Sequence, residues 1–271
     1  MDCYGVIGYP IKHSVSPAMH NAAFKELGID AIYTTFEVKP ENLETAIKGA
    51  KALGIKGLNV TIPHKENVIR FSKPDEITSK IGAANTLKFG EEILAYNTDV
   101  YGAIKALEDA GVSVSGKIVL IVGAGGAARA IAFALTEKKA TVIITNRTEQ
   151  RGLKLAQDVR KYGECMFVPM KDLEKLDFDI LINATPVGMN NYMPGKLPVD
   201  EKIIRGDLIV FDTVYNPMET PLIKLAKMRG CKIVYGIDML VYQGAKSFEI
   251  WTGLTPPVNV MKRAALEALK R

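Results

Sequence analysis

Short apolar runs alternate with proline-led amphipathic stretches through the first part of the chain. Residues 3–8, 31–38 and 57–62 have the length and apolar content of buried strands. Residues 17–27 and 40–53 carry apolar side chains at helical spacing, and a glycine that can end a helix follows each stretch. This strand–helix–strand–helix–strand order predicts parallel pairing of the strands through right-handed crossovers.

The elements that follow are shorter and less regular. Residues 64–71 and 74–81 are both predicted as helices, and a turn is predicted at 9–13 after the first strand. Residues 84–97 predict a hairpin around a glycine. A helix should then begin at 98–99 and continue to the glycine at position 111, because Thr and Asp are favoured at helix starts.

The second part of the chain repeats the alternation with more regularity. Strands are predicted at 117–122, 141–145, 166–169, 179–183, 208–212 and 232–235, with helices between most of them. The fold class is therefore α/β with two domains. Residues 102–237 form a Rossmann-like domain, and residues 1–101 with 238–271 form a mostly parallel α/β domain. The closing helices at 239–251 and 257–270 should complete this other domain, the last one covering its sheet.

Composition narrows the class of protein. The chain has 271 residues, 48% hydrophobic and 24% charged, and a net charge of +5 without any long run of Lys or Arg. That charge suits an anionic small molecule better than nucleic acid. Cys3, Cys165 and Cys231 are far apart and form no CxxC pair, so we expect no disulfide framework, no metal site and a cytoplasmic location. Neither a signal peptide nor a membrane span is predicted.

Two serines precede the first predicted helix. Ser16 followed by Pro17 is typical of a helix start, with serine as the N-cap and proline at the first helical position. Hydroxyls at a helix N-terminus favour an anion. Capping alone accounts for Ser16, but it does not account for Ser14.

Lys65 lies just beyond the end of a predicted strand, because Pro63 cannot continue strand pairing. Side chains at such strand ends face the cleft of an open α/β sheet, where a lysine can donate a proton. The alternative is an exposed lysine in a turn. Asp99 has two interpretations as well: an N-cap or first-turn acid of a helix, or a partner that orients Lys65.

A glycine-rich turn follows the strand at 117–122. Gly123, Ala124, Gly125, Gly126, Ala127 and Ala128 fit the pattern G-x-G-x-x-G/A between a strand and a helix. Its glycines allow a tight turn and a close approach of a pyrophosphate, which predicts a dinucleotide site. A glycine-rich turn without a ligand is the alternative.

The end of the next strand indicates which dinucleotide binds. An NAD site usually has an acid there for the ribose hydroxyl, whereas this strand ends in Asn146, Arg147 and Thr148, with Arg151 one turn later. Guanidinium groups match phosphate geometry, so we expect NADP. Surface arginines at a helix start would explain Arg151, but not the missing acid.

Taken together, these motifs resemble the shikimate dehydrogenase family over nearly the whole chain. The matching stretches are 14–17, 59–65, 82–86, 97–99, 123–128, 146–148, 183–186, 212–215 and 236–243. The resemblance implies NADP-dependent reduction of 3-dehydroshikimate to shikimate in aromatic amino-acid biosynthesis. It implies a small-molecule substrate, no nucleic acid and no membrane, and it is compatible with a homodimer.

The resemblance also implies a role for each site residue. Lys65 and Asp99 would be the catalytic pair, and Ser14 and Ser16 would hold the substrate carboxylate. The ring hydroxyls would be held by Thr61, Asn85, Asp99 and Gln243, and Tyr215 would close over the substrate. The cofactor would be lined by Glu76, Gly123, Ala124, Gly125, Gly126, Ala127, Asn146, Arg147, Thr148, Arg151, Thr213, Gly236 and Met239.

Two other functions stay open at this point. The first is a quinate dehydrogenase or a dual shikimate/quinate enzyme, because a pocket rejects one added hydroxyl only weakly. Serines at positions 14 and 16, and the lack of an acid at the strand end beside Arg147, favour shikimate and NADP. The second is a non-catalytic regulator with the same fold, since fold alone does not imply turnover. Retention of both Lys65 and Asp99 argues against it.

Overall fold

The computed structural model describes residues 1–11 and 14–270, and these divide into two compact units. The first unit comprises Met1–Gly102 and Val241–Arg271, and the second comprises Ala103–Leu240. The turn predicted at 9–13 extends to Lys12 and His13, which lie outside the described residues. The domain limits predicted from the sequence fall after residues 101 and 237, and which ligand each unit holds stays a prediction.

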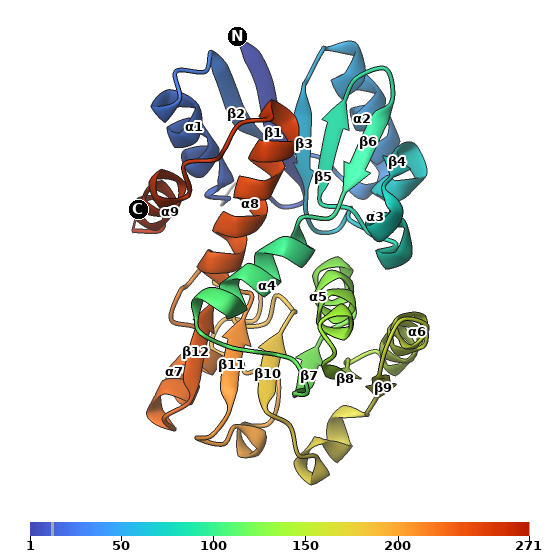
Figure 1. The fold of residues 1–271 in the computed structure, drawn as a ribbon, viewed down its shortest axis with the longest axis vertical. Helices are drawn as coiled ribbons and strands as arrows, with labels where there is room; N and C mark the ends of the chain where they lie inside the picture. The colour runs from blue at the N-terminus through green and yellow to red at the C-terminus, as the bar shows by residue number, and fades with distance from the viewer. Residues whose placement is uncertain (12–13, 271) are drawn as a thin grey trace. The chain divides into compact units, whose positions relative to one another are not determined.

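The first unit is built on a mixed sheet with the strand order β2-β1-β3-β5-β6-β4 (Figure 1). Its strands are β1 (Asp2–Gly8), β2 (Ala31–Glu37), β3 (Gly57–Val60), β4 (Lys73–Pro74), β5 (Thr86–Phe89) and β6 (Ile93–Tyr96). The predicted parallel pairing of β1 with both β2 and β3 is confirmed. The predicted hairpin is β5 and β6, which pair antiparallel, and β5 is also antiparallel to β3.

The helices of the first unit are α1 (Ser16–Glu26), α2 (Leu43–Ala52), α3 (Glu76–Ile81) and α9 (Val258–Ala268). Helices α4 (Asp99–Asp109) and α8 (Gly236–Thr252) each run from one unit into the other. The prediction that the last helix covers the sheet is wrong, because α9 packs against α1. Helix α8 contacts the sheet instead, and Trp251 Nε1 donates a hydrogen bond to the Leu87 carbonyl at 2.8 Å.

The helix predicted over 64–71 is also wrong. This segment consists of turns and a 3-10 helix, η2 (Val68–Phe71). The His64 ring, held 2.7 Å from the Val38 carbonyl, fixes the segment as a loop, and His64 and Val68 are the residues of this segment that are fully buried. The following helix begins at Glu76 rather than Pro74, because Asp75 caps it by accepting from the Thr78 amide at 2.8 Å.

The start of α1 differs from the prediction as well. Ser16 is the first helical residue, Val15 occupies the N-cap, and the N-cap side chain makes no capping hydrogen bond. The Ser14 hydroxyl accepts the Ser16 amide at 3.3 Å. The predicted N-cap role of Ser16 is therefore wrong, and the hydroxyl that binds a free helix amide belongs to Ser14.

The second unit is a parallel sheet with the strand order β12-β11-β10-β7-β8-β9. Its strands are β7 (Ile118–Val122), β8 (Thr141–Thr145), β9 (Cys165–Phe167), β10 (Ile180–Asn183), β11 (Ile209–Asp212) and β12 (Lys232–Tyr235). Its helices are α5 (Gly126–Glu137), α6 (Glu149–Arg160) and α7 (Pro221–Met228). The strand order reverses between β7 and β10, as in a dinucleotide-binding fold, and the predicted α/β class is confirmed.

A buried histidine lies in the core of the first unit. The His20 ring stacks on Tyr33, with ring centroids 4.3 Å apart, and lies against Trp251. Neither ring nitrogen has a hydrogen-bond partner among the residues that the structure describes. This burial lowers the pKa of His20 to about 3, so the ring is neutral at physiological pH.

His20 should therefore make the protein sensitive to acid. A neutral buried imidazole stabilises the fold above its ordinary pKa of 6.5, and this stability is lost as the pH falls toward 3. Between pH 7 and pH 5 the loss is about 2 kcal/mol. Denaturant unfolding of the parent and of His20→Phe at both pH values should show this loss only in the parent.

Protonation of Asp212 changes the free energy of unfolding in the opposite sense. Comparing the variant with the parent cancels this contribution. Burial raises the pKa of Asp212 to about 6, so this group favours the folded state more at pH 5 than at pH 7. It is present in both proteins and cancels in the difference. An equal fall of the unfolding free energy in parent and His20→Phe would contradict the role given to His20.

Candidate active site

Three strands of the first sheet end, and a fourth begins, at one edge of that sheet. The pairs Ile7↔Val60, Asn59↔Thr86 and Thr86↔Tyr96 place the carboxyl ends of β1, β3 and β6 beside the amino end of β5. The loops at this edge carry Ser14 and Ser16 after β1, Thr61 and Lys65 after β3, Asn85 before β5, and Asp99 after β6. The sheet topology thus gathers the side chains proposed for substrate and catalysis.

Lys65 and Asp99 form a short, largely buried ion pair. Lys65 Nζ lies 2.6 Å from Asp99 Oδ2, and the two side chains are 15% and 4% exposed. The backbone of Lys65 is fixed because its carbonyl accepts the Ala84 amide at 2.8 Å. The interpretation of Lys65 as an exposed turn lysine is therefore wrong.

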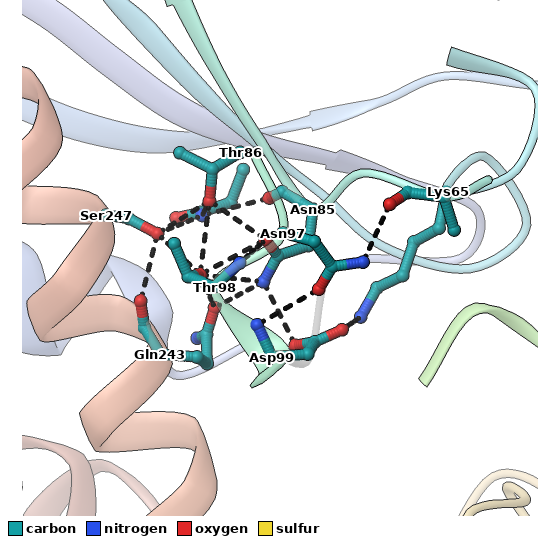
Figure 2. A network of polar contacts seen from close by, with 10 residues as sticks. Lys65, Asn85, Thr86, Asn97, Thr98, Asp99, Gln243 and Ser247 are labelled. Atoms are coloured by element: carbon teal, nitrogen blue, oxygen red, sulfur yellow. Dashed lines mark hydrogen bonds and ion pairs between the residues drawn. The ribbon is translucent and has the colours of Figure 1, made fainter. Parts of the chain in front are cut away.

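The side-chain amides of Asn85 and Gln243 continue the hydrogen bonding of the site beyond this ion pair. Asn85 Oδ1 accepts the Thr98 amide at 2.7 Å, which fixes the orientation of the Asn85 side chain. Its Nδ2 then donates to Asp99 Oδ1 and to Gln243 Oε1, each at 3.0 Å (Figure 2). With both Asp99 oxygens accepting hydrogen bonds, the carboxylate is oriented by two donors rather than by a helix cap.

Behind these residues lies a set of polar side chains that the sequence alone did not indicate. Asn85, Thr98 and Gln243 are joined to Thr86, Ser247, Asn59 and Tyr33 by further hydrogen bonds. We call the whole set the buried polar network; its members are Tyr33, Asn59, Lys65, Asn85, Thr86, Thr98, Asp99, Gln243 and Ser247. One signal in the sequence was available: Ser247 follows Gln243 by four residues, so both lie on one face of α8.

Ser14, Ser16 and Thr61 lie in the same unit at the same sheet edge. Thr61 follows β3, and its amide donates to the Ile7 carbonyl at 3.0 Å, so it stays beside the end of β1. A Cβ at Gly8 would come within 2.6 Å of the Thr61 methyl, so a glycine is required there. Ser16 is buried at the start of α1.

Glu76 differs from the other proposed cofactor residues because it lies in the first unit. It is the first residue of α3, is exposed, and pairs with Lys80 at 2.6 Å. The Lys80 ammonium lowers the pKa of this carboxyl by hydrogen bonding. The structure thus gives Glu76 an ordinary surface role within its helix, and any contact with a cofactor stays a prediction.

In the second unit, the glycine-rich turn lies where the strand order reverses. Gly123 follows β7 with φ +122°, and a Cβ there would come within 2.9 Å of the Ala184 carbonyl after β10. Among the residues that the structure describes, and leaving out its two chain neighbours, no heavy atom lies within 4 Å of the position a Cβ would take on Gly125, the N-cap of α5. Gly126 and Ala127 begin the helix, so their amides have no partner within it. This open helix N-terminus suits a pyrophosphate.

The turn after β8 carries the basic residues. Asn146 Nδ2 donates to the Thr148 carbonyl at 2.8 Å, which shapes the turn, and Thr148 precedes α6. Arg147, Thr148 and Arg151 are exposed. The predicted set of donors is therefore gathered at the carboxyl end of β8, next to β7 in the sheet.

The loops after β10 and β11 are shaped by a buried carboxylate. Asp212 accepts from Thr220 Oγ1 at 2.6 Å, Asn183 Nδ2 at 2.9 Å and the Val214 amide at 3.0 Å. Burial nevertheless raises its pKa to about 6. Thr213, whose hydroxyl donates to the Asn183 carbonyl at 2.8 Å, is thereby held in place.

The remaining predicted residues of the second unit lie in the loop after β11 and in helix α8. Tyr215 follows β11, and Gly236 and Met239 belong to the first turns of α8. A Cβ on Gly236 would clash with the Thr213 carbonyl, so these two proposed cofactor residues are in direct contact. Met239 is buried.

Residues 1–11 and 14–270 contain no group of His, Cys, Asp or Glu side chains suited to a metal ion. Within the same ranges, no helix combines the length and the apolar character needed to cross a bilayer.

Known protein families match three separate parts of the chain. Residues 6–87 match the family described as shikimate dehydrogenase substrate binding domain. Residues 105–196 match the family described as shikimate/quinate 5-dehydrogenase, and residues 236–266 match that described as shikimate 5'-dehydrogenase C-terminal domain. These matches together cover most of the chain.

Individual relatives match along their full length. A protein of Archaeoglobus fulgidus named shikimate dehydrogenase (NADP(+)) is 55% identical over 98% of both chains. A solved shikimate dehydrogenase in complex with NADP+ superposes with a TM-score of 0.94 at 43% identity, covering 100% of this chain and 96% of the other. The enzyme of Thermus thermophilus in complex with NADP(H) and shikimate has a TM-score of 0.90 at 35% identity, covering 99% and 100%. The chain belongs to the shikimate dehydrogenase family.

Proposed function

We propose that the protein is an oxidoreductase that catalyses the reversible, NADPH-dependent reduction of 3-dehydroshikimate to shikimate. Its family and its relatives support this activity. The observation that carries the proposal is the ion pair of Lys65 and Asp99, joined at 3.0 Å to an amide that also binds Gln243. A proton-transfer pair thus lies within a set of neutral donors suited to a polyol.

In this proposal Lys65 transfers the proton at the substrate oxygen. Its ammonium is held by Asp99 at 2.6 Å, so Nζ has a fixed position and two remaining hydrogens for a ligand. Asp99 stays a hydrogen-bond acceptor, fixed by Asn85 on its other oxygen. During reduction Lys65 donates a proton to the oxygen that becomes the hydroxyl, and during oxidation it receives that proton.

The substrate is proposed to be held by hydroxyl and amide groups of the first unit. Asn85, Gln243 and Thr61 would bind ring hydroxyls, because buried donors and acceptors reject analogues that lack their partners. Ser14 and Ser16 at the start of α1 would bind the carboxylate, where helix amides favour an anion. Tyr215 would close over the substrate.

The residues of the second unit fit NADP. The open space above Gly125 at the start of α5 suits the pyrophosphate, and Arg147 with Asn146, Thr148 and Arg151 suits the 2′-phosphate. The cofactor site would be completed by the backbone of Thr213, which packs on Gly236, and by the side chain of Met239. Glu76 is a further residue proposed to contact the cofactor. When bound, the cofactor supplies the hydride.

Replacing Arg147 by alanine should raise the KM for NADP+ by about ten- to a hundredfold and that for NAD+ by less than about threefold. Only NADP+ carries the phosphate that the guanidinium would bind. Steady-state kinetics with both cofactors measures the ratio. Lys161→Ala, beyond the opposite end of the 12-residue helix α6, is the matched control. Equal losses with both cofactors would remove the 2′-phosphate role.

The function itself is tested by initial rates of absorbance gain from reduced cofactor. Shikimate and quinate should each be combined with NADP+ and with NAD+. We expect turnover of shikimate with NADP+ to exceed the other three combinations. Comparable turnover of quinate would indicate a dual enzyme, and binding of NADP without turnover would indicate a regulator of the same fold.

We further propose a cytoplasmic location, supported by free thiols at Cys3, Cys165 and Cys231, since a reducing compartment keeps thiols unpaired. A homodimer stays a prediction that light scattering of the purified protein tests directly.

A further inference from the structure

We propose that Ser247 is a positioning residue that holds the substrate-binding amide of Gln243 in place. The inference rests on the proposed function, because it assigns Gln243 to the substrate. Ser247 lies on α8, is fully buried, and was not among the residues that the sequence indicated. It touches none of the groups proposed to react.

Ser247 connects α8 to the sheet edge one turn away from Gln243. Its hydroxyl lies 2.7 Å from Thr86 Oγ1 and 3.2 Å from Thr98 Oγ1, and it accepts from Asn59 Nδ2 at 2.9 Å. It also lies 3.0 Å from the Gln243 carbonyl, to which it can donate. One hydroxyl thus joins the two strands that flank the site to the helical turn that carries Gln243 (Figure 2).

The hydrogen bond between Tyr33 and Asn59 fixes which groups donate and which accept in these contacts. The Tyr33 hydroxyl donates to Asn59 Oδ1 at 2.8 Å, so Asn59 must present its NH2 group to Ser247. Ser247 then accepts from Asn59 and has one hydrogen left, for the Gln243 carbonyl or a threonine hydroxyl. A chain of oriented donors therefore runs from Tyr33 to α8.

Hydrogen bonds of fixed direction also hold the side chain of Gln243. Thr98 and Thr86 hydroxyls lie 3.1 Å from Asn85 Oδ1, and Asn85 Nδ2 donates to Gln243 Oε1 at 3.0 Å. Because Oε1 accepts from Asn85, the orientation of the Gln243 side-chain amide is fixed, which sets the direction of its NH2 group. Loss of the Ser247 hydroxyl would leave Asn59 and Thr86 without a partner on α8 and remove the hydrogen bonds that hold this turn of the helix against the sheet edge.

The experiment uses Ser247→Ala in the full-length protein. Its matched control is Thr252→Val, because the Thr252 hydroxyl lies on the same helix and bonds the carbonyl four residues earlier at 2.9 Å, outside the buried polar network. For Ser247→Ala we expect the KM for shikimate to rise about tenfold, with kcat within about threefold and the KM for NADP+ within about twofold. Thr252→Val should leave all three within about twofold.

A second measurement does not depend on turnover. The chain has three glutamines, Gln150, Gln157 and Gln243, and the first two are exposed on the second unit. Selective ¹⁵N labelling of glutamine side chains therefore gives three pairs of NMR signals, and the pair lost in Gln243→Glu identifies Gln243. In Ser247→Ala without ligand, the Gln243 signals should shift while those of Gln150 and Gln157 stay unchanged.

Unmoved Gln243 signals and a shikimate KM within about twofold of the parent would overturn the inference, even if the melting temperature fell. If the parent protein does not turn over shikimate, the proposed function fails, and the NMR comparison still decides whether Ser247 positions Gln243. If Ser247→Ala does not fold, Tyr33→Phe removes the bond that orients Asn59. It should shift the Gln243 signals as well, and unmoved signals would again overturn the inference.

Discussion

Replacing Lys65 by methionine is expected to lower kcat for shikimate oxidation by about a thousandfold, within the range that a positioned acid–base group supplies. Methionine keeps the apolar stem but has no proton to transfer. Because Lys65 is proposed to act on the reacting oxygen rather than to hold the ring, shikimate binding should stay within about threefold. Steady-state rates and a binding titration of the inactive variant measure the two effects.

The matched control for this variant is Lys48→Met. Lys48 pairs with Glu44 at 2.6 Å, the same distance as in the Lys65–Asp99 pair, but on the exposed face of α2. An exposed pair contributes at most about 1 kcal/mol, so activity should be unchanged. Retention of more than about a tenth of kcat by Lys65→Met would rule out the proton-transfer role.

Replacing Asp99 by asparagine should lower kcat by about a hundred- to a thousandfold. One carboxylate oxygen faces Lys65 Nζ and the other faces Asn85 Nδ2, and both neighbours are donors. An asparagine has one oxygen, so its NH2 group must face one of these donors. Either Lys65 loses its anchor or Asn85 turns away from its present position, and both disturb the site.

Asp99→Asn is best compared with Asp109→Asn. Asp109 ends the same helix, α4, and pairs with Lys105 at the partly exposed surface. The control should keep kcat and KM within about twofold. If Asp99→Asn and Asp109→Asn had similar kinetics, Asp99 would be a structural residue and the catalytic pair would reduce to Lys65 alone.

The second unit could be predicted almost entirely from the sequence, because its strands are buried on both faces and separated by helices. Such strands appear as continuous apolar runs, as in residues 118–122 and 180–182, and each run ends in a polar or glycine-rich turn. Local pattern and tertiary structure agree there. The glycine-rich turn was found for the same reason, since its spacing is local.

The first unit was less predictable where tertiary contacts outweigh local pattern. The apolar residues near Val68 have helical spacing, but the His64 ring bound to the Val38 carbonyl holds this segment as a loop. At α1 the sequence indicated a capping serine, and only the backbone geometry shows that the hydroxyl at position 14 binds the helix amide. Contacts of this kind have no signature within a sequence window.

Roles could be predicted from the sequence for only part of the buried polar network. Seven of its nine members, all but Tyr33 and Ser247, belong to stretches that resemble a known family, but the resemblance gave no role to Asn59, Thr86 or Thr98. Asn59 and Ser247, which support the members with predicted roles, are 188 residues apart and meet only because α8 lies on the sheet. A pairing over that distance is set by the fold as a whole, so no spacing rule could have found it.

The division of the first unit into two chain segments has a consequence for biosynthesis. The second unit is one continuous segment, so all of its residues are synthesised before residues 241–270. Gln243, Ser247 and Trp251 all belong to that last segment, and each bonds to a strand or loop translated far earlier. The nascent chain therefore contains every residue of its second unit before the buried polar network of the first unit can form, because that network needs Gln243 and Ser247.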